Sequence, residues 1–239
     1  MKELGFFDLI GFGPEGWGAT LLAGAGMTVI VALCGFAIGL LIGTLGTWAK
    51  VSGGPIVRKA AEIYTNVLRG VPDLLVIYLV YFGGSAILTS IWTFYGASGF
   101  VSFPGFIAGS LAIGVTSGAL NIEVLRGGLS AVNRGEIEAA YAFGMPRLLL
   151  FRRIIAPLVL RHALPGLGNS WLSVLKESSL LSVTGIAELL RQAQVAAGST
   201  NRPFDFFIAA GILYIVLAAI SGLFVLFAER HFSRGTRRA

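Results

Sequence analysis

Several polar and charged side chains fall inside, or at the ends of, the long apolar stretches of this sequence. Those that could meet a solute are Asp73, Asn121, Glu123, Lys176 and Glu177. A carboxylate can receive the cationic end of a solute, and an amide can bond to its backbone groups. Because polar groups are costly at membrane depth, such residues are candidates for a substrate pathway by default.

Ion pairing is the competing interpretation of these charges. Asp73 could pair with Arg69, and Glu123 could pair with Arg126, since the members of each pair are close in the sequence. Glu177 could likewise pair with the lysine that precedes it, at a membrane interface. The residue types alone leave both interpretations open.

A second informative stretch connects two apolar blocks at 133–157 and reads NRGEIEAAYAFGMPRLLLFRRIIAP. Its start is too polar to cross a bilayer, and its apolar positions favour a short amphipathic helix. Gly144 and Pro146 predict where that helix ends. The small residues Ala139 and Ala140 would let it seat closely in a groove on another protein. An ordinary surface connector is the alternative.

Composition places these residues in a membrane protein. Apolar residues make up 55% of the 239 and charged residues only 13%, whereas a soluble domain carries about 25% charged residues. The apolar residues form blocks that reach the roughly 20 residues of a membrane-spanning helix. We therefore expect an all-α integral membrane protein with about five transmembrane helices in one domain, 1–239. The expected spans are about 19–48, 60–87, 106–125, 154–175 and 206–228.

Small residues and prolines add detail to two of these spans. Gly35, Gly39 and Gly43 follow at four-residue spacing, which lets a neighbouring helix approach closely. Pro157 and Pro165 predict that the fourth span is broken. Broken helices often line transport sites, although two prolines could equally serve packing alone.

Charge predicts the orientation. Basic residues occur between the first and second spans, between the third and fourth, and in the tail at 229–239, whereas 88–105 carries no charge. The positive-inside rule assigns the basic connections to the cytoplasm. We expect the N-terminus outside, the C-terminus inside, and the short helix at about 133–147 on the cytoplasmic face.

The connecting stretch resembles the EAA loop of permease subunits in binding-protein-dependent ABC importers. The residues that carry this resemblance are Glu138, Ala139, Ala140, Gly144, Ile154 and Pro157. The family pattern ends in Leu-Pro, whereas this chain has Ala156 before its proline. Segments 69–83, 117–128 and 164–180 look like the polar amino-acid branch of the family, so the resemblance covers about residues 20–230. Arg-Gly-Val-Pro-Asp at 69–73 resembles the histidine, lysine–arginine–ornithine and opine systems.

The resemblance implies a permease subunit in the bacterial inner membrane that moves polar or basic amino acids or opines. By the same resemblance the helix at 133–147 is a coupling helix, in which Glu138 and Gly144 are most sensitive to change. The implied partners are a dimer of cytoplasmic ATP-binding subunits, a second homologous permease or a second copy, and a periplasmic solute-binding protein. No G-x-x-x-x-G-K-[ST] phosphate loop occurs in the sequence, so ATP and magnesium are expected on the partner. We expect no cofactor, metal or nucleic acid on this chain.

Other functions remain to be weighed. A secondary transporter or channel working alone would need its own ion-coupling residues deep in the bilayer. A membrane enzyme would need a convergent catalytic group, which Cys34, His162 and His231 do not suggest. The sequence leaves open which amino acid or opine is carried, and whether the permease is a heterodimer or a homodimer.

Overall fold

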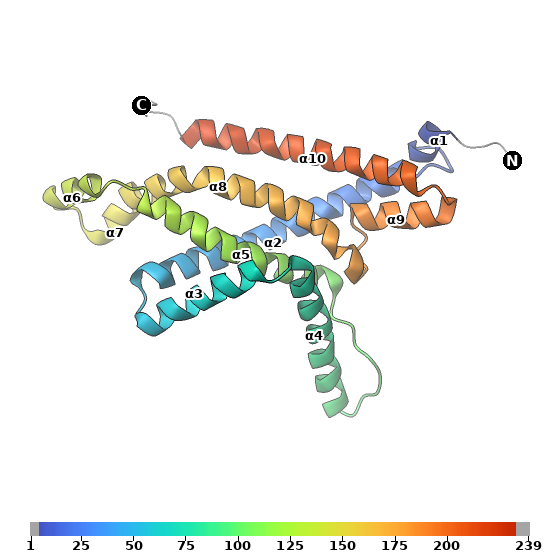
Figure 1. Ribbon diagram of the computed structural model, residues 1–239, viewed down its shortest axis with the longest axis horizontal. Helices are drawn as coiled ribbons and strands as arrows, with labels where there is room; N and C mark the ends of the chain where they lie inside the picture. Colours follow the sequence, from blue (N-terminus) through green and yellow to red (C-terminus); the bar gives the residue numbers. More distant parts are fainter. Residues whose placement is uncertain (1–4, 233–239) are drawn as a thin grey trace.

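The computed structural model describes residues 5–232, and all its regular elements are helices (Figure 1). In chain order they are α1 (Phe6–Ile10), α2 (Gly18–Ser52), α3 (Pro55–Gly70), α4 (Asp73–Phe94), α5 (Gly105–Ser130), α6 (Arg134–Ala142), α7 (Arg147–Leu150), the π-helical turn η1 (Phe151–Ile155), α8 (Ala156–Glu177), the 3₁₀ helix η2 (Ser178–Thr184), α9 (Leu189–Thr200) and α10 (Pro203–Phe232). The all-α prediction is confirmed, and the predicted basic tail lies outside the described residues from 233 onward.

Four helices are long and apolar enough to cross a membrane: α2, α4, α5 and α10. The fourth predicted span, 154–175, coincides with α8, which has 22 residues but is less apolar. The difference arises because α8 carries Arg161, His162 and Lys176. It packs against α5 and α10, and those contacts cover part of its surface.

The second predicted span, 60–87, is two helices instead of one. α3 ends at Gly70, and α4 begins at Asp73 and leaves the bundle at a steep angle (Figure 1). Pro72 separates them because it has no N–H to donate. A proline also disfavours helical geometry in the preceding residue, and Val71 is extended, with φ −99° and ψ 135°.

Close packing of α2 on α5 forms the centre of the bundle. Gly35, Gly39 and Gly43 of α2 are buried against α5, as their spacing predicts. A Cβ atom at Gly43 would lie 2.7 Å from Cβ of Asn121, and one at Gly39 would lie 2.2 Å from Oγ of Ser117. The absent side chains therefore set how near the two backbones come.

The two prolines of α8 do less than their sequence positions suggest. Pro157 lies in the first turn of α8 and directly follows the π-helical turn η1. The helical backbone runs from α7 through η1 into α8 without a loop, and a proline inside a helix has no N–H to donate to the preceding turn. α8 continues through Pro165, so the predicted break there is wrong. The irregular geometry lies at η1 instead.

A buried carboxylate holds α9 in place. Glu188 is fully buried and accepts hydrogen bonds from the N–H groups of Leu190 (2.8 Å) and Arg191 (2.5 Å) and from the hydroxyl of Tyr214 (3.0 Å). Burial raises the pKa of the Glu188 carboxyl, and the two N–H groups oppose that rise. Glu188 thus joins the N-terminus of α9 to α10.

The bundle has two ends of different character. One end holds α6, α7 and the turn between α2 and α3, and the other holds α1 and α9 (Figure 1). The basic residues of both connections therefore gather at the α6 end, among them Lys50, Arg58, Arg134 and Arg147. The predicted orientation requires the basic residues to gather at one end, as they do here. Which end faces the cytoplasm stays a prediction.

The α2–α5 contact predicts the outcome of a matched pair of substitutions. Gly43→Ala should lower the thermal stability of the detergent-purified protein, because overpacking costs about 1–3 kcal/mol. Gly26→Ala, also within α2, places its methyl group where no atom lies within 4 Å. That control should match or slightly exceed the wild type, because alanine favours helix over glycine by about 1 kcal/mol. Equal melting temperatures for the two variants would contradict the packing argument.

Candidate functional site

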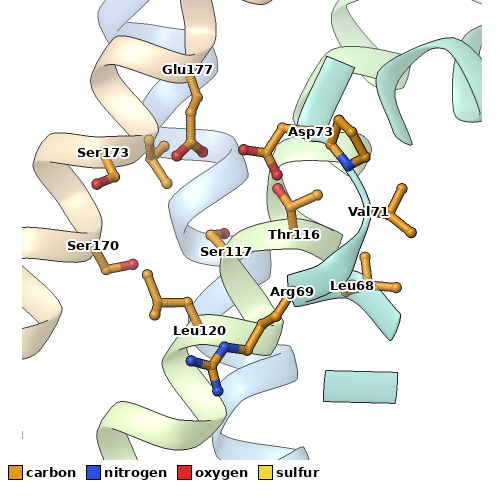
Figure 2. Close-up of a pocket in the computed structure, with 12 residues that line it drawn as sticks. Leu68, Arg69, Val71, Asp73, Thr116, Ser117, Leu120, Ser170, Ser173 and Glu177 are labelled. Atoms are coloured by element: carbon orange, nitrogen blue, oxygen red, sulfur yellow. The ribbon is translucent and has the colours of Figure 1, made fainter. Parts of the chain in front are cut away.

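A cavity of about 260 Å³ opens where α3, α4, α5 and α8 meet (Figure 2). We call it the central pocket. Its lining residues are Leu68, Arg69, Val71, Pro72, Asp73, Thr116, Ser117, Leu120, Ser170, Ser173, Val174 and Glu177. The volume is slightly below the range for small-molecule sites, about 300–1,000 Å³. The pocket is thus of a size for one small solute.

The helix break at Pro72 builds one wall of the central pocket. It places Asp73 in the first turn of α4, opposite Glu177, the last residue of α8. Figure 2 shows the two carboxylates facing one another across the pocket. Arg69, just before the break, lies below the two carboxylates in this view. Two carboxylates and one guanidinium therefore border a single space.

Hydroxyl groups supply the remaining polarity of the pocket. Thr116 and Ser117 come from α5, and Ser170 and Ser173 come from α8. Ser117 donates to the carbonyl of Ile113 at 2.7 Å. The buried hydroxyl of Ser170 has no hydrogen-bond partner within residues 5–232. Since buried polar groups are nearly always bonded, Ser170 has a hydrogen bond available for a bound molecule.

The structure brings two of the five predicted pathway residues, Asp73 and Glu177, into this pocket. Neither alternative pairing is formed there: among the described residues, Asp73 makes no ion pair with Arg69, nor Glu177 with Lys176. Lys176 is exposed and does not line the pocket. For Asp73 and Glu177 the ion-pair interpretation is therefore wrong in this structure.

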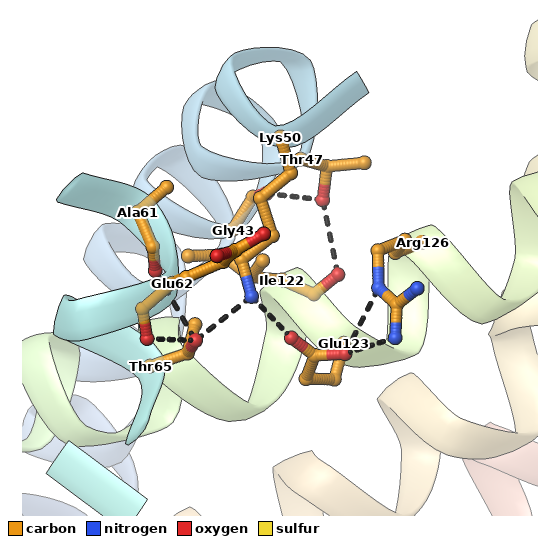
Figure 3. Close-up of polar contacts among 9 residues, drawn as sticks. All are labelled: Gly43, Thr47, Lys50, Ala61, Glu62, Thr65, Ile122, Glu123 and Arg126. Carbon is orange, nitrogen blue, oxygen red and sulfur yellow. Dashed lines mark hydrogen bonds and ion pairs between the residues drawn. The ribbon is translucent and has the colours of Figure 1, made fainter. Parts of the chain in front are cut away.

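Glu123 is held by ion pairs instead (Figure 3). Its Oε1 lies 2.5 Å from Nζ of Lys50, and its Oε2 lies 2.7 Å from Nη2 of Arg126. The same Lys50 ammonium donates to Oγ1 of Thr65 at 2.8 Å. The pairing predicted with Arg126 is thus confirmed, and the cluster joins α2, α3 and α5.

Asn121 faces α2 and lies outside the central pocket. It is fully buried beside Gly39 and Gly43, and neither its Oδ1 nor its Nδ2 has a hydrogen-bond partner within the described chain. Its residue type predicted a polar contact with a solute. Its position on α5 instead turns it toward the contact with α2.

Sequence reasoning missed the hydroxyl residues of the pocket. Ser170, Ser173 and Glu177 lie at positions i, i+3 and i+7 of α8, so they share one helix face. That spacing is readable from the sequence. It is a weak signal, because serines also occur on membrane helices for packing.

α6 forms where a short helix is predicted. The Asn133 side chain accepts from the N–H of Gly135 at 2.9 Å and caps its first turn. The chain turns away after Ala142 through Gly144, whose φ of 71° is in the left-handed region that glycine adopts readily. Glu138 and Ala139 are exposed, and Ala140 is buried. Ile154 lies in η1 and Pro157 in the first turn of α8.

An apolar surface lies beside α6. Tyr141 is 52% exposed, Phe143 is 88% exposed and Leu148 of α7 is 79% exposed. These side chains occur at the basic end of the bundle, next to arginines that would lie outside a bilayer. Apolar groups in such a place, rimmed by polar residues, mark a contact with another protein or with the membrane.

Comparisons with known proteins identify the family. A family model described as "Binding-protein-dependent transport system inner membrane component" matches residues 35–238. The octopine transport system permease protein OccQ of Rhizobium meliloti is 52% identical over 235 residues, which cover 98% of this chain and 99% of that protein. The histidine/lysine/arginine/ornithine transport system permease protein HisQ of Escherichia coli K12 is 37% identical, over 94% of this chain and 98% of that one.

A solved structure agrees with the sequence matches. The crystal structure of an amino acid ABC transporter with histidines contains a chain that superposes with a TM-score of 0.76 at 31% identity, covering 90% of this chain and 95% of that one. The matched region includes the central pocket and α6. The chain therefore belongs to the family of binding-protein-dependent transport system inner membrane components, and it is a multi-pass protein of the inner membrane.

Proposed function

We propose that this chain is one permease half of an ATP-driven importer for basic amino acids or opines. The observation that carries the proposal is the pair Asp73 and Glu177, two carboxylates that border one small pocket without ion pairs of their own. A cation is the complement of such a pair. The names of the relatives, which specify octopine in one case and histidine, lysine, arginine and ornithine in another, support the same substrate class.

The rest of the central pocket suits the other end of such a solute. The Arg69 guanidinium could pair with a carboxylate of the substrate, a contact that arginine makes with two parallel hydrogen bonds. The hydroxyls of Ser170 and Ser173 could bond to its amino or amide groups. A molecule that carries both charges would thus satisfy both sides of the pocket.

Energy for transport would come from partner subunits. The sequence has no phosphate loop, so we place ATP and magnesium on a dimer of cytoplasmic ATPases and no cofactor on this chain. A soluble binding protein would deliver the solute from the periplasm, and a second permease or second copy would complete the passage. This assignment puts the N-terminus outside and the basic α6 end in the cytoplasm.

The path of force in this proposal runs along the chain from α6 to the central pocket. α6 would seat on the ATPase through Glu138, Ala139, Ala140 and the neighbouring aromatic rings. From there α7 and η1 lead directly into α8, with Ile154 and Pro157 at the junction. Because α8 carries Ser170, Ser173 and Glu177, a displacement of α6 would move one wall of the pocket. The alternative function, a secondary transporter that works alone, would need no such link to a partner.

The pocket carboxylates predict a defined transport defect. Glu177→Gln should raise KM for basic amino-acid uptake by about tenfold or more, because a contact to a charged group contributes about 1.5–3 kcal/mol. The measurement is radiolabelled uptake into proteoliposomes that hold the assembled complex. Lys176→Gln alters the adjacent, exposed residue outside the pocket and should leave KM unchanged. An unchanged KM in Glu177→Gln would overturn the substrate assignment.

The end of α6 predicts a different defect. Gly144→Asp should leave the protein inserted but abolish uptake and substrate-stimulated ATP hydrolysis. The change adds a charged side chain to the turn that ends α6, at a positive φ that most residues other than glycine adopt at a cost of about 1–2 kcal/mol. Gly135→Ala, in the first turn of α6, is the control, since its methyl group meets only an ordinary contact at 3.4 Å. Co-purification of the ATPase with each variant reports docking. Normal stimulation in Gly144→Asp would refute the role of α6.

A further inference from the structure

A second cavity lies beside the first and is lined entirely by polar side chains. Its volume is about 410 Å³, and its lining residues are Lys50, Glu62, Asn66, Arg69, Glu123 and Arg126. We call it the polar pocket. Only 13% of the chain is charged, yet five of these six residues are. Figure 3 shows four of them, the Lys50–Glu123–Arg126 cluster and the nearby Glu62.

The polar pocket continues the central pocket toward the basic end of the bundle. Arg69 lines both cavities. On α3, the other polar-pocket residues come earlier than Arg69, nearer the turn to α2. On α5, Glu123 and Arg126 come after Thr116 and Ser117, nearer α6. The two cavities therefore follow one another along α3 and α5, the two helices that line both.

One face of α3 carries this polarity. Glu62, Asn66 and Arg69 lie at positions i, i+4 and i+7, so they share a face of the helix, and all three are exposed. The adjacent side of the helix carries Ile63 and Val67, which are 55% and 51% exposed. A helix with this division has one side for water and one side for lipid or protein. Water beside α3 would extend inward to the middle of α5, where the central pocket lies.

Some charged residues of the polar pocket form ion pairs with one another, and others form none within residues 5–232. Glu123 is neutralised by Lys50 and Arg126. Glu62 and Arg69 form no ion pair within residues 5–232. Seven residues of helix separate this carboxylate from this guanidinium, a rise of about 10 Å along the axis. The amide of Asn66 lies between them on the same face.

We propose that the polar pocket is a second binding station for the transported solute, on its way from the central pocket to the basic end. Arg69 holds the solute carboxylate at the boundary, while the cationic end moves from Asp73 and Glu177 to Glu62. The structural basis is the shared Arg69 and the free Glu62 on one water-facing side of α3. This inference rests on the proposed import of basic amino acids or opines.

Thiol labelling tests whether α3 faces the passage. In a Cys34→Ala background, which removes the one native cysteine, Asn66→Cys and Val67→Cys are compared in the assembled complex in proteoliposomes. The probe is a charged methanethiosulfonate reagent. The thiol introduced at position 66 should react about tenfold faster than the one at 67, because position 66 lies on the polar side of α3 and position 67 on the side that suits lipid or protein. Saturating lysine or arginine should slow labelling at 66 alone.

A second variant separates the station from the central pocket. Glu62→Gln should lower kcat for uptake about tenfold, the effect of losing one contact to a charge, and leave KM near the wild-type value. Arg58→Gln, on α3 but outside the polar pocket, should keep both constants.

The outcomes distinguish this inference from the proposed function. If the wild-type complex does not import basic amino acids or opines, the proposed function fails. If import proceeds but position 66 labels no faster than 67, is not protected by solute, or Glu62→Gln keeps its kcat, the second station is refuted while the proposed function stands.

Discussion

Close contact between α2 and α5 is the constraint on which the rest of this structure depends. Apolar side chains gain little by leaving lipid, so helices in a membrane are held together by van der Waals packing and polar contacts. The glycines of α2 allow that packing by bringing its backbone against Ser117 and Asn121. α5 is then the central helix of the bundle, because α3, α4 and α8 also pack on it. Residues of α5 border both cavities.

Two departures from regular helix turn this packed bundle into a transport structure. The break at Pro72 ends α3 beside the middle of α5 and starts α4 with Asp73 at the pocket. The π-helical turn η1 joins the α6–α7 segment to α8 without a loop. Irregular backbone inside a membrane protein is tolerated where protein or a water-filled cavity satisfies it. The first departure builds the pocket, and the second connects the pocket to the surface helix.

The acidic residues that border the two cavities differ in their ion pairing. Glu123 is compensated by cations from α2 and α5, and that cluster fixes three helices at the basic end. Asp73 and Glu177 form no ion pair within residues 5–232, and they border an open space that Arg69 also lines. A compensated carboxylate stabilises the fold, whereas an uncompensated one has a charge available for a solute. In a family of membrane transport components, this division distinguishes the residues that hold helices together from those that border a cavity.

The sequence by itself determined the class of the protein, the family, the small-residue face of α2 and the short helix at α6. Those features depend on local patterns: apolar block length, glycine spacing and the turn chemistry of Gly144. It could not decide that 60–87 is two helices, that α8 continues through Pro165, or that Asn121 turns toward α2. Only the tertiary structure separated Glu123 from Asp73 and Glu177, because whether a carboxylate finds a cation depends on distant residues such as Lys50. Charge compensation is a property of the folded arrangement, and residue type does not encode it.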